Sequence, residues 1–506
     1  MTAFVRRHGT SDHVRTDGTR VPAVRKMTKA LCDKLNARRR IGLFTVALFA
    51  ATMTSAGTRG IDRAGGRPNV LLVSIDTLRA DHLSCYGYAR PTSPVIDRLA
   101  REGTLFTNAQ SGSSWTTPSH MTMLTSLRVP VHGVDGPGRQ LAPGRTTLAE
   151  QLREAGYDTA AFVGAPTLSR AFGFDRGFTR YENWMALPDS AEPPGRGPDL
   201  PADVLLRTHD AKPARAVADA ASDWMTHHTG APFFAFVHLW DPHYDYHPPP
   251  PYDRAFDPAY RGQFDFTDFE RNPGIVPGMP EREREHLVAL YDGEIASTDA
   301  IVGRIVDALE RAGLLDETLI VITSDHGEEF FEHEGKGHVH TLFQEIVHVP
   351  LVFRSPRLVP AGRRVDAVFE ATNLMPTILG LVGLPSPPDI AGRDLSTTVR
   401  GQAPPPDLWA FAETAQTHAE PFYLVRIGDF ALLGTRGPSE QKMAFDLQTD
   451  PREQHAHLMS AAKERAFDRY VDQVIGDEAS RGPAPSETTL DTLTTQELRE
   501  LGYLER

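Results

Sequence analysis

Five short apolar runs, each rich in β-branched or aromatic residues, constrain the fold of this chain more than any other feature of its sequence. They cover residues 69–76, 159–164, 233–241, 318–325 and 349–356. A continuous apolar run of this length is typical of a strand covered by helices on both faces. Stretches with a helical spacing of apolar residues separate these runs, over residues 93–103, 146–156, 214–228 and 286–313. The alternation predicts an α/β fold with a mainly parallel central sheet flanked by helices.

The pattern also indicates where the chain divides. Residues 68–404 carry the alternating strands and helices, and two Pro-rich stretches, 187–203 and 247–282, interrupt them as loops or lids. After residue 405 the pattern changes to short candidate strands followed by a polar, acidic tail. We therefore expect one catalytic α/β domain over residues 68–404 and a small C-terminal α+β subdomain with a tail over residues 405–506.

The N-terminal segment differs from the rest of the chain in charge. Residues 1–60 carry twelve Lys and Arg but only three Asp and Glu, whereas the whole chain has a net charge of −13. A basic cluster there precedes the apolar run 41–57, which ends in small residues. This order predicts a secretory signal, with a membrane anchor as the alternative. We expect an exported protein, periplasmic or secreted, that is either released or held at the membrane by residues 41–57. The acidic body argues against nucleic acid as a partner.

Acidic and imidazole side chains stand where the predicted strands end. They are Asp76 after the first strand, Asp241 and His243 after the third, and Asp325 and His326 after the fourth. Ligands of open α/β sheets collect at the carboxyl ends of the strands. A lone Asp at a strand end is usually a turn cap, but a set of carboxylates and imidazoles suits Zn, Mn or a similar divalent ion. The pattern predicts a metal site.

The stretch SSWTTPSH, residues 113–120, places Thr116 two positions before Pro118. Proline favours the first turn of a helix, so Thr116 is expected at a helix N-terminus. Free N–H groups and the helix dipole favour negative charge at that point. The position suits an ordinary helix cap, and it equally suits a nucleophile that attacks an anionic ester. A metal ion in contact with Thr116 would lower the pKa of its hydroxyl and hold it in line for attack.

These segments together resemble the sulfatase family of the alkaline phosphatase superfamily over nearly all of residues 68–503. The resemblance rests on ordered stretches that read NVLLVSIDTLRADHLSCYGY, PSHMTMLTS, WDPHYDYHPPPPY, YDGEIASTDAIVGRIVDAL, ITSDHGEEF, VHVPLVF, FDLQTDPREQ and LRELGYL. It implies an alkaline-phosphatase-like fold. It also implies that Asp76, Asp325, His326 and the Thr116 hydroxyl are metal ligands.

The same resemblance implies further roles around this site. His243 and His338 would face the substrate, or would bind a second ion together with Asp241. His338 is the alternative candidate for donating a proton to the leaving group. Three more residues are candidates for contact with the substrate anion: His120, His132 and Lys336. Glu328 and Glu329 are expected to shape their loop rather than to take part in the chemistry.

The chain departs from the family pattern at three positions. Sulfatases have a Cys or Ser that is converted to formylglycine within a C/S-x-P-x-R motif, whereas this chain has Thr116 there and His120 in place of the Arg. Thr77 stands where the second Asp of the usual Asp-Asp pair is found. The hydrated-aldehyde mechanism of the family is therefore closed to this chain. A threonine nucleophile resembles the phosphodiesterases and the phosphoglycerol or phosphoethanolamine transferases of the superfamily instead.

The sequence thus predicts a metal-dependent hydrolase of sulfate or phosphate esters that uses Zn, Mn or Ca, as one ion or two. The metal-activated Thr116 attacks sulfur or phosphorus in line and forms a covalent ester, which water releases. The expected substrate is a sulfated or phosphorylated small molecule, glycan or lipid head group. Two alternatives stay open: a membrane-associated transferase with the same site and another acceptor, and an inactive sulfatase-like binding protein. The presence of Asp76, Asp325 and His326 argues against the second.

Overall fold

The computed structural model describes residues 66–478 except for 137, 185–212, 416–419, 437–440 and 458, together with 482–488, 490, 495 and 499. The predicted signal or anchor at residues 41–57 and the Pro-rich stretch 187–203 lie outside the described residues. Within the described part of the chain, no helix is long and apolar enough to cross a membrane. Residues 67–506 group into one compact unit, and this unit carries the candidate site.

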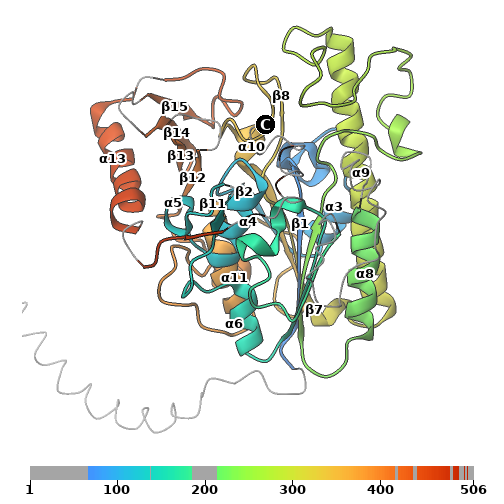
Figure 1. The fold of residues 1–506 in the computed structure, drawn as a ribbon, viewed down its shortest axis with the longest axis vertical. Helices are drawn as coiled ribbons and strands as arrows, with labels where there is room; N and C mark the ends of the chain where they lie inside the picture. The colour runs from blue at the N-terminus through green and yellow to red at the C-terminus, as the bar shows by residue number, and fades with distance from the viewer. Residues whose placement is uncertain are drawn as a thin grey trace, which may run out of the picture. The chain divides into compact units, whose positions relative to one another are not determined.

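The described residues form a central eight-stranded sheet in the order β11-β2-β10-β7-β1-β6-β4-β5 (Figure 1). The strands are β1 (Asn69–Ile75), β2 (Thr104–Gln110), β4 (Asp158–Val163), β5 (Arg180–Asn183), β6 (Phe233–Leu239), β7 (Thr318–Ser324), β10 (His348–Arg354) and β11 (Arg363–Glu370). β1 pairs in parallel with both β6 and β7, whereas β10 is antiparallel to β2 and β7. The five predicted strands and the mainly parallel sheet are confirmed.

Helices cover both faces of this sheet. One face carries α3 (Pro94–Arg101), α8 (Ala214–His227) and α9 (Glu281–Arg311), and the other carries α4 (Thr116–Thr125), α6 (Leu148–Glu154) and α11 (Leu374–Leu381). Side chains of a strand alternate between its two faces, and β1 shows this clearly. Val70 and Leu72 pack on the α4 side, while Leu71 and Val73 pack on the α9 side. The apolar run is continuous because both faces are buried.

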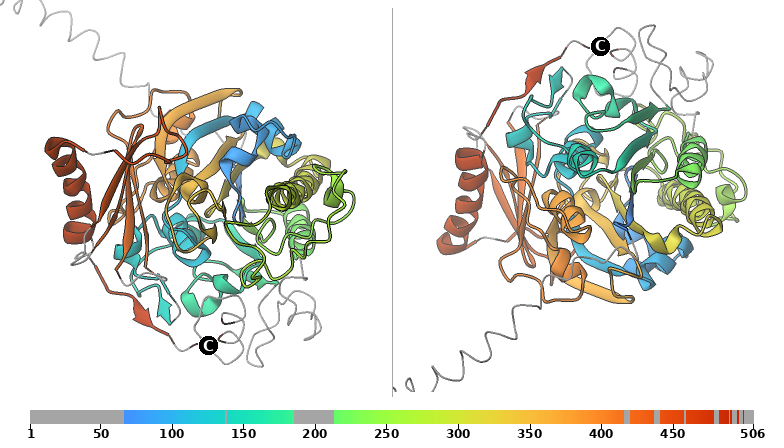
Figure 2. Two further views of the ribbon diagram at one scale, coloured as in Figure 1. Left: turned by 90° about the horizontal axis from the view of Figure 1, so that it is seen from above. Right: turned by 90° about the horizontal axis from the view of Figure 1, so that it is seen from below.

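The C-terminal part folds as a second, smaller sheet. Its antiparallel strands are β12 (Trp409–Thr414), β13 (Phe422–Ile427), β14 (Phe430–Thr435) and β15 (Lys442–Asp446). Helix α13 (Ala461–Asp472) packs on one face of this sheet, as the red helix beside the orange strands of Figure 2 shows. The predicted α+β subdomain is therefore present. Shorter elements complete the chain: β3 (Arg139–Gln140), β8 (Glu329–Phe330), β9 (Lys336–Gly337), β16 (Ser486–Glu487), α5 (Val129–His132), α10 (Gln344–Val347) and α12 (Ser396–Val399).

An imidazole links the loop after β8 to the C-terminal part. His333 Nδ1 lies 2.6 Å from Glu345 Oε1, and its Nε2 lies 3.1 Å from the carbonyl of Glu453. The His333 ring also stacks on Phe343, with the ring centroids 3.5 Å apart. Burial disfavours the charged imidazole, but the hydrogen bond and charge of Glu345, together with the contacts to Glu453, outweigh this and raise the pKa of His333 from 6.5 to about 9.

The raised pKa of His333 gives a pH-dependent contribution to stability. A group whose pKa is raised by folding stabilises fully below its unfolded pKa, and the contribution is lost as the pH rises through the folded value. We expect the free energy of unfolding to fall by about 1 to 3 kcal/mol between pH 6.5 and 9 from this residue, because the charged imidazole and its interaction with the buried Glu345 are lost over that range. Urea unfolding of the wild type and His333→Gln across that range measures it. An equal slope in both proteins would contradict the prediction.

Candidate active site

Thr116 is the first residue of α4 and is fully buried. The cap position itself belongs to Trp115, whose backbone is extended. The Thr116 hydroxyl donates a hydrogen bond to Asp76 Oδ2, with an oxygen–oxygen distance of 3.4 Å. The interpretation of Thr116 as an ordinary helix cap is therefore wrong. Its hydroxyl faces the end of β1, at a helix N-terminus whose first N–H groups have no partner within the helix.

Strand alternation brings polar side chains from three neighbouring strands to the same face of the sheet. Ser74 and Asp76 keep the parity of the β1 residues that pack toward α4, and so does Asp325 relative to β7. His238 of β6 stands opposite Ser74 in the sheet register. Because the three strands are parallel neighbours, their carboxyl ends meet beneath the start of α4. The local sequence thus builds the site from the ends of buried strands.

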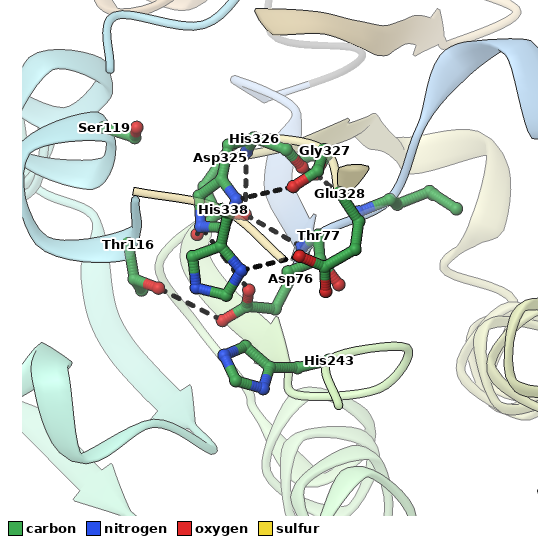
Figure 3. Close-up of polar contacts among 12 residues, drawn as sticks. Asp76, Thr77, Thr116, Ser119, His243, Asp325, His326, Gly327, Glu328 and His338 are labelled. Atoms are coloured by element: carbon green, nitrogen blue, oxygen red, sulfur yellow. Dashed lines mark hydrogen bonds and ion pairs between the residues drawn. The ribbon is translucent and has the colours of Figure 1, made fainter. Parts of the chain in front are cut away.

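Asp76, Asp325 and His326 form the centre of the site. One ligand atom of each lies within 4.8 Å of the others, and Figure 3 shows Thr116, His243 and His338 arranged around the Asp76 carboxylate. Asp76 Oδ1, Asp325 Oδ2 and His326 Nε2 are buried and have no hydrogen-bond partner among the described residues. Unpaired polar atoms are costly in a protein interior. These three atoms therefore fit a divalent cation.

Backbone groups hold the other polar atoms of Asp325 and His326 in place. Asp325 Oδ1 accepts hydrogen bonds from the backbone N–H groups of His326, at 2.9 Å, and Thr77, at 3.3 Å. His326 Nδ1 donates to the carbonyl of Gly327 at 2.9 Å. This bond puts the ring proton on Nδ1 and leaves Nε2 as the ligand atom. The turn after β7 thus orients both ligands before any ion binds.

The charges of Asp76, Asp325 and His326 strongly shift one another's pKa values. Burial and the charge of Asp325 raise the pKa of Asp76 well above its ordinary value. Burial alone would raise the pKa of Asp325, but the neighbouring imidazoles, His326 first among them, and the backbone N–H of His326 together outweigh it and lower that pKa. The pKa of His326 is raised, because the two carboxylates outweigh the effect of its burial. The cluster favours one positive charge beside the carboxylates, which a proton or a metal cation can supply.

Two more imidazoles flank the cluster. His243 stacks on Trp240, with ring centroids 4.0 Å apart, and its edge meets His338 at 4.9 Å. His338 Nδ1 lies 2.8 Å from Glu328 Oε1, and the Tyr246 hydroxyl donates to Glu328 Oε2 at 2.7 Å. Burial raises the pKa of Glu328 to about 8. Glu328 therefore fixes the orientation of His338 from within the protein.

Comparison with known proteins identifies the family. The family model described as Sulfatase matches residues 68–384. The chain belongs to the sulfatase family. A second model, described as N-sulphoglucosamine sulphohydrolase, C-terminal, matches residues 336–475 of this sulfatase-family chain. The family is one of metal-dependent ester hydrolases, and the cluster at Asp76, Asp325 and His326 lies within the first match.

Individual relatives are distant but cover most of their length. The N-acetylglucosamine-6-O-sulfatase of Bacteroides thetaiotaomicron is 23% identical over 84% of this chain and 89% of its own. A solved structure of a protein in complex with its substrate D-glucosamine-2-N,6-O-disulfate has a TM-score of 0.66 and 20% identity, over 82% and 100% of the two chains. The phosphonate monoester hydrolase of Agrobacterium radiobacter has a TM-score of 0.62 and 24% identity, over 84% and 100%. The two structures support the fold of the sulfatase-family chain.

His120, which replaces the arginine of the family motif, does not face a substrate. Its Nδ1 donates to the carbonyl of Thr116 at 2.8 Å, and its Nε2 accepts from Ser74 Oγ at 2.9 Å. The ring is fully buried, and burial lowers the pKa of His120 to about 3. A neutral, buried imidazole with both nitrogens in use cannot bind an anion. His120 instead ties the first residue of α4 to β1.

Lys336 and His132 also have structural roles. Lys336 Nζ donates to three carbonyls of the 269–275 loop, at 2.7, 3.3 and 3.0 Å, which uses all the protons of the ammonium group. His132 Nε2 lies 3.1 Å from Thr122 Oγ1, and its Nδ1 accepts from the backbone of Val134 at 3.0 Å. The interpretation of these two residues as anion ligands is therefore not supported by their contacts.

Asp241 follows β6 as expected but does not join the cluster at Asp76 and Asp325. It is buried, and its carbonyl accepts a hydrogen bond from Thr298 of α9 at 3.3 Å. It belongs to neither of the ligand groups found among the described residues. A second ion at Asp241 and His243 remains a prediction from the family resemblance.

Two residues at the site escaped the sequence interpretation, Glu328 and His238. Glu328 was assigned to loop structure, yet it contacts His338 through a short hydrogen bond. His238 interrupts the apolar run FFAFVHLW and lies 3.3 Å from Asp76 Oδ2 through its Nε2. The signal for His238 was present, because a histidine inside a fully buried strand needs a partner.

Proposed function

We propose that this protein hydrolyses sulfate or phosphate esters with the hydroxyl of Thr116 as the nucleophile. The observation that carries the proposal is the position of Thr116 Oγ1. It lies at the buried N-terminus of α4 and 3.4 Å from Asp76 Oδ2, beside the unpaired ligand atoms of Asp325 and His326. A hydroxyl held between a helix N-terminus and a cation site is placed to attack an anionic ester.

The cation would be held by Asp76, Asp325 and His326, with the Thr116 hydroxyl as a further ligand. A divalent ion bound there supplies Lewis-acid chemistry, since it lowers the pKa of a hydroxyl and neutralises the ester oxygens. As Thr116 Oγ1 bonds to sulfur or phosphorus, its proton passes to Asp76 Oδ2, which accepts its hydrogen bond. The bond to the leaving oxygen breaks, and a threonine ester remains. Water then attacks that ester and gives a proton to Nε2 of His338. The bond between Thr116 Oγ1 and sulfur or phosphorus breaks, Asp76 Oδ2 returns the proton to Thr116 Oγ1, and free sulfate or phosphate leaves.

His338 is the proton donor to the leaving oxygen in this proposal. Burial and the charge of His326 lower the pKa of His338, so the negative charge of the bound ester is needed to keep its ring protonated. Its Nδ1 is engaged by Glu328, so Nε2 is the nitrogen that exchanges a proton with the substrate. The Tyr246 hydroxyl holds the other oxygen of Glu328 and keeps the pair from rotating. His243 lies against His338 and Trp240 and contacts the non-bridging oxygens of the bound group. His243 and Tyr246 come from the loop after β6, Glu328 from the turn after β7, and His338 directly follows β9.

The relatives suggest where to look for the substrate. An N-acetylglucosamine-6-O-sulfatase matches 84% of this chain, and a protein of the same fold binds D-glucosamine-2-N,6-O-disulfate as its substrate. A sulfated amino sugar is therefore the first natural ester to test. The basic and apolar segment at residues 34–57 supports export of the enzyme to the compartment where such glycans occur.

The proposal is tested with purified protein and its Thr116→Ala variant on four esters, each with Zn, Mn and Ca in turn. The esters are p-nitrophenyl sulfate, p-nitrophenyl phosphate, bis-p-nitrophenyl phosphate and glucosamine 6-sulfate. Turnover of any of them that disappears in the variant supports a threonine hydrolase and tells which ester class it prefers. Release of p-nitrophenol that is faster with added glycerol or sugar would indicate a transferase. Equal turnover in both proteins would overturn the proposal.

Glu328→Gln tests the role of the pair with His338. We expect kcat to fall by about 10- to 100-fold for a poor leaving group such as phenol, and less for p-nitrophenol, since only the poor leaving group needs the proton. KM should change little. A series of substituted phenyl esters measures this through the dependence of kcat on the pKa of the leaving group.

Glu329→Gln is the matched control. Glu329 is equally buried and accepts hydrogen bonds from the backbone of His333 and Gly335 and from His340. Its loss should leave the leaving-group dependence of kcat unchanged, whatever it does to stability. An identical dependence in Glu328→Gln and in the wild type would remove Glu328 from the mechanism.

A further inference from the structure

The proposed mechanism does not use His238. It is fully buried on β6, and neither of its ring nitrogens has a hydrogen-bond partner among the described residues. A neutral imidazole always has one N–H donor and one acceptor. Leaving both unpaired in the interior costs free energy that the fold recovers only if something else occupies the site.

The ring of His238 lies next to the proposed ligands. Its Nε2 is 3.3 Å from Asp76 Oδ2, and a ring nitrogen of His238 groups with Asp325 and His120 within 4.8 Å. His120 cannot serve as a ligand, because its nitrogens are bonded to the Thr116 carbonyl and the Ser74 hydroxyl. His238 is therefore the imidazole of this group that is available to a cation.

The ligand set has a place for such a nitrogen. Thr77 stands where the family pattern has a second aspartate, and its backbone N–H is directed at Asp325 Oδ1, at 3.3 Å. Because Thr77 carries no carboxylate, the proposed metal-ligand set of this chain has one carboxylate fewer than the family pattern. His238 approaches the same two carboxylates from the neighbouring strand, since β6 pairs directly with β1.

We propose that His238 is a ligand of the metal ion and replaces the missing aspartate. The inference rests on the metal site of the proposed function. The resulting set has two carboxylates, from Asp76 and Asp325, and two imidazoles, from His326 and His238. When both carboxylates are ionised, their charge balances the charge of a divalent ion. Imidazole nitrogens shift the preference of a site toward Zn and Mn and away from Ca.

The test compares metal binding by the full-length wild type, His238→Ala and His238→Leu after removal of metal with a chelator. Dialysis against buffered Zn or Mn, followed by elemental analysis, gives the dissociation constants. We expect both variants to bind Zn at least about 10-fold more weakly, with a smaller loss for Ca. Pulsed electron paramagnetic resonance of the Mn form should show two coordinated histidine nitrogens in the wild type and one in each variant.

His348→Ala is the matched control, since His348 lies in the same sheet and its Nε2 is bonded to the carbonyl of Thr107 at 2.8 Å. It should bind metal as the wild type does. Circular dichroism of the metal-free proteins shows whether each variant is folded. If one of the two replacements at position 238 does not fold, the other still gives the result. Two coordinated nitrogens, or an unchanged Zn affinity, in a folded His238 variant would overturn the inference.

Failure of this inference differs from failure of the proposed function. If Thr116→Ala loses all turnover while His238→Ala binds Zn as the wild type does, the threonine mechanism holds and His238 is not a ligand. If the Mn form shows two histidine nitrogens in the wild type and one in His238→Ala, but the wild type turns over no ester, His238 is a ligand and the hydrolase proposal is wrong.

Discussion

Thr116→Ala is expected to lower kcat by at least about 1,000-fold on every ester that the wild type turns over. The variant has no oxygen at the N-terminus of α4, so no covalent ester can form. Metal content should stay close to that of the wild type, because Asp76, Asp325 and His326 are unchanged. The free energy of unfolding should change by no more than about 1 kcal/mol, the worth of one hydrogen bond. Steady-state rates, elemental analysis and urea unfolding measure the three quantities.

Thr117→Ala and Thr116→Ser make this result specific. Thr117 is also buried, but its hydroxyl donates to the carbonyl of Thr167 at 3.1 Å rather than to Asp76. Its alanine variant should keep most of the activity. Thr116→Ser keeps the hydroxyl and should retain measurable turnover. Mass spectrometry of acid-quenched wild type should find the sulfate or phosphate on the peptide that contains Thr116. A rate for Thr116→Ala within 10-fold of the wild type would remove it as the nucleophile.

Asp76→Asn is expected to have opposite effects on the metal-bound and metal-free protein. The affinity for Zn or Mn should fall by at least about 100-fold, and turnover with it, because an anionic ligand becomes neutral. In chelator, however, the variant should be more stable than the wild type by about 1 kcal/mol or more. Folding raises the pKa of Asp76 well above its ordinary value, through burial and the charge of Asp325, so this carboxyl group destabilises the metal-free protein at neutral pH. The neutral Asn does not carry this cost. Thermal unfolding with and without metal measures both effects.

Asp292→Asn provides the contrast. The Asp292 carboxylate is also fully buried, but it is paired with His82, Tyr88 and Arg90 at 2.6–2.8 Å. Its replacement should destabilise the protein equally in chelator and in metal, with the metal affinity unchanged. If Asp76→Asn lost stability in chelator as Asp292→Asn does, the Asp76 carboxyl group would not be the destabilising group described above.

The main strands could be read from the sequence because both of their faces are buried. Three strands of the central sheet were missed. They carry polar residues and lie at or next to the sheet edges: β2 reads TLFTNAQ, β5 reads RYEN and β11 reads RRVDAVFE. None of them gives a continuous apolar run. The antiparallel direction of β10 was also beyond the sequence pattern, since it depends on pairing with β2 and β7 and not on local composition.

The site was predictable where position along a strand decides the contact. Asp76, Asp325 and Thr116 follow directly from strand ends and a helix start. The role of Lys336 depends instead on carbonyls of residues 269–275 in another loop, and that of Glu328 depends on Tyr246 across the site. Such partners are distant in sequence, so a lysine or glutamate in a polar loop looks the same whether it binds a substrate, orients a base or closes a loop.

The link between His120, the Thr116 carbonyl and Ser74 has a consequence for how this enzyme can diverge. It fastens Thr116, the proposed nucleophile, to β1, the same strand that ends in Asp76. The residues 247–280, by contrast, form a long connection in which buried residues such as Phe269 and Ile275 anchor many exposed ones. None of these residues takes part in the link between Thr116 and β1. The exposed positions of the connection can therefore change during evolution without altering the distance between the Thr116 hydroxyl and the Asp76 carboxylate.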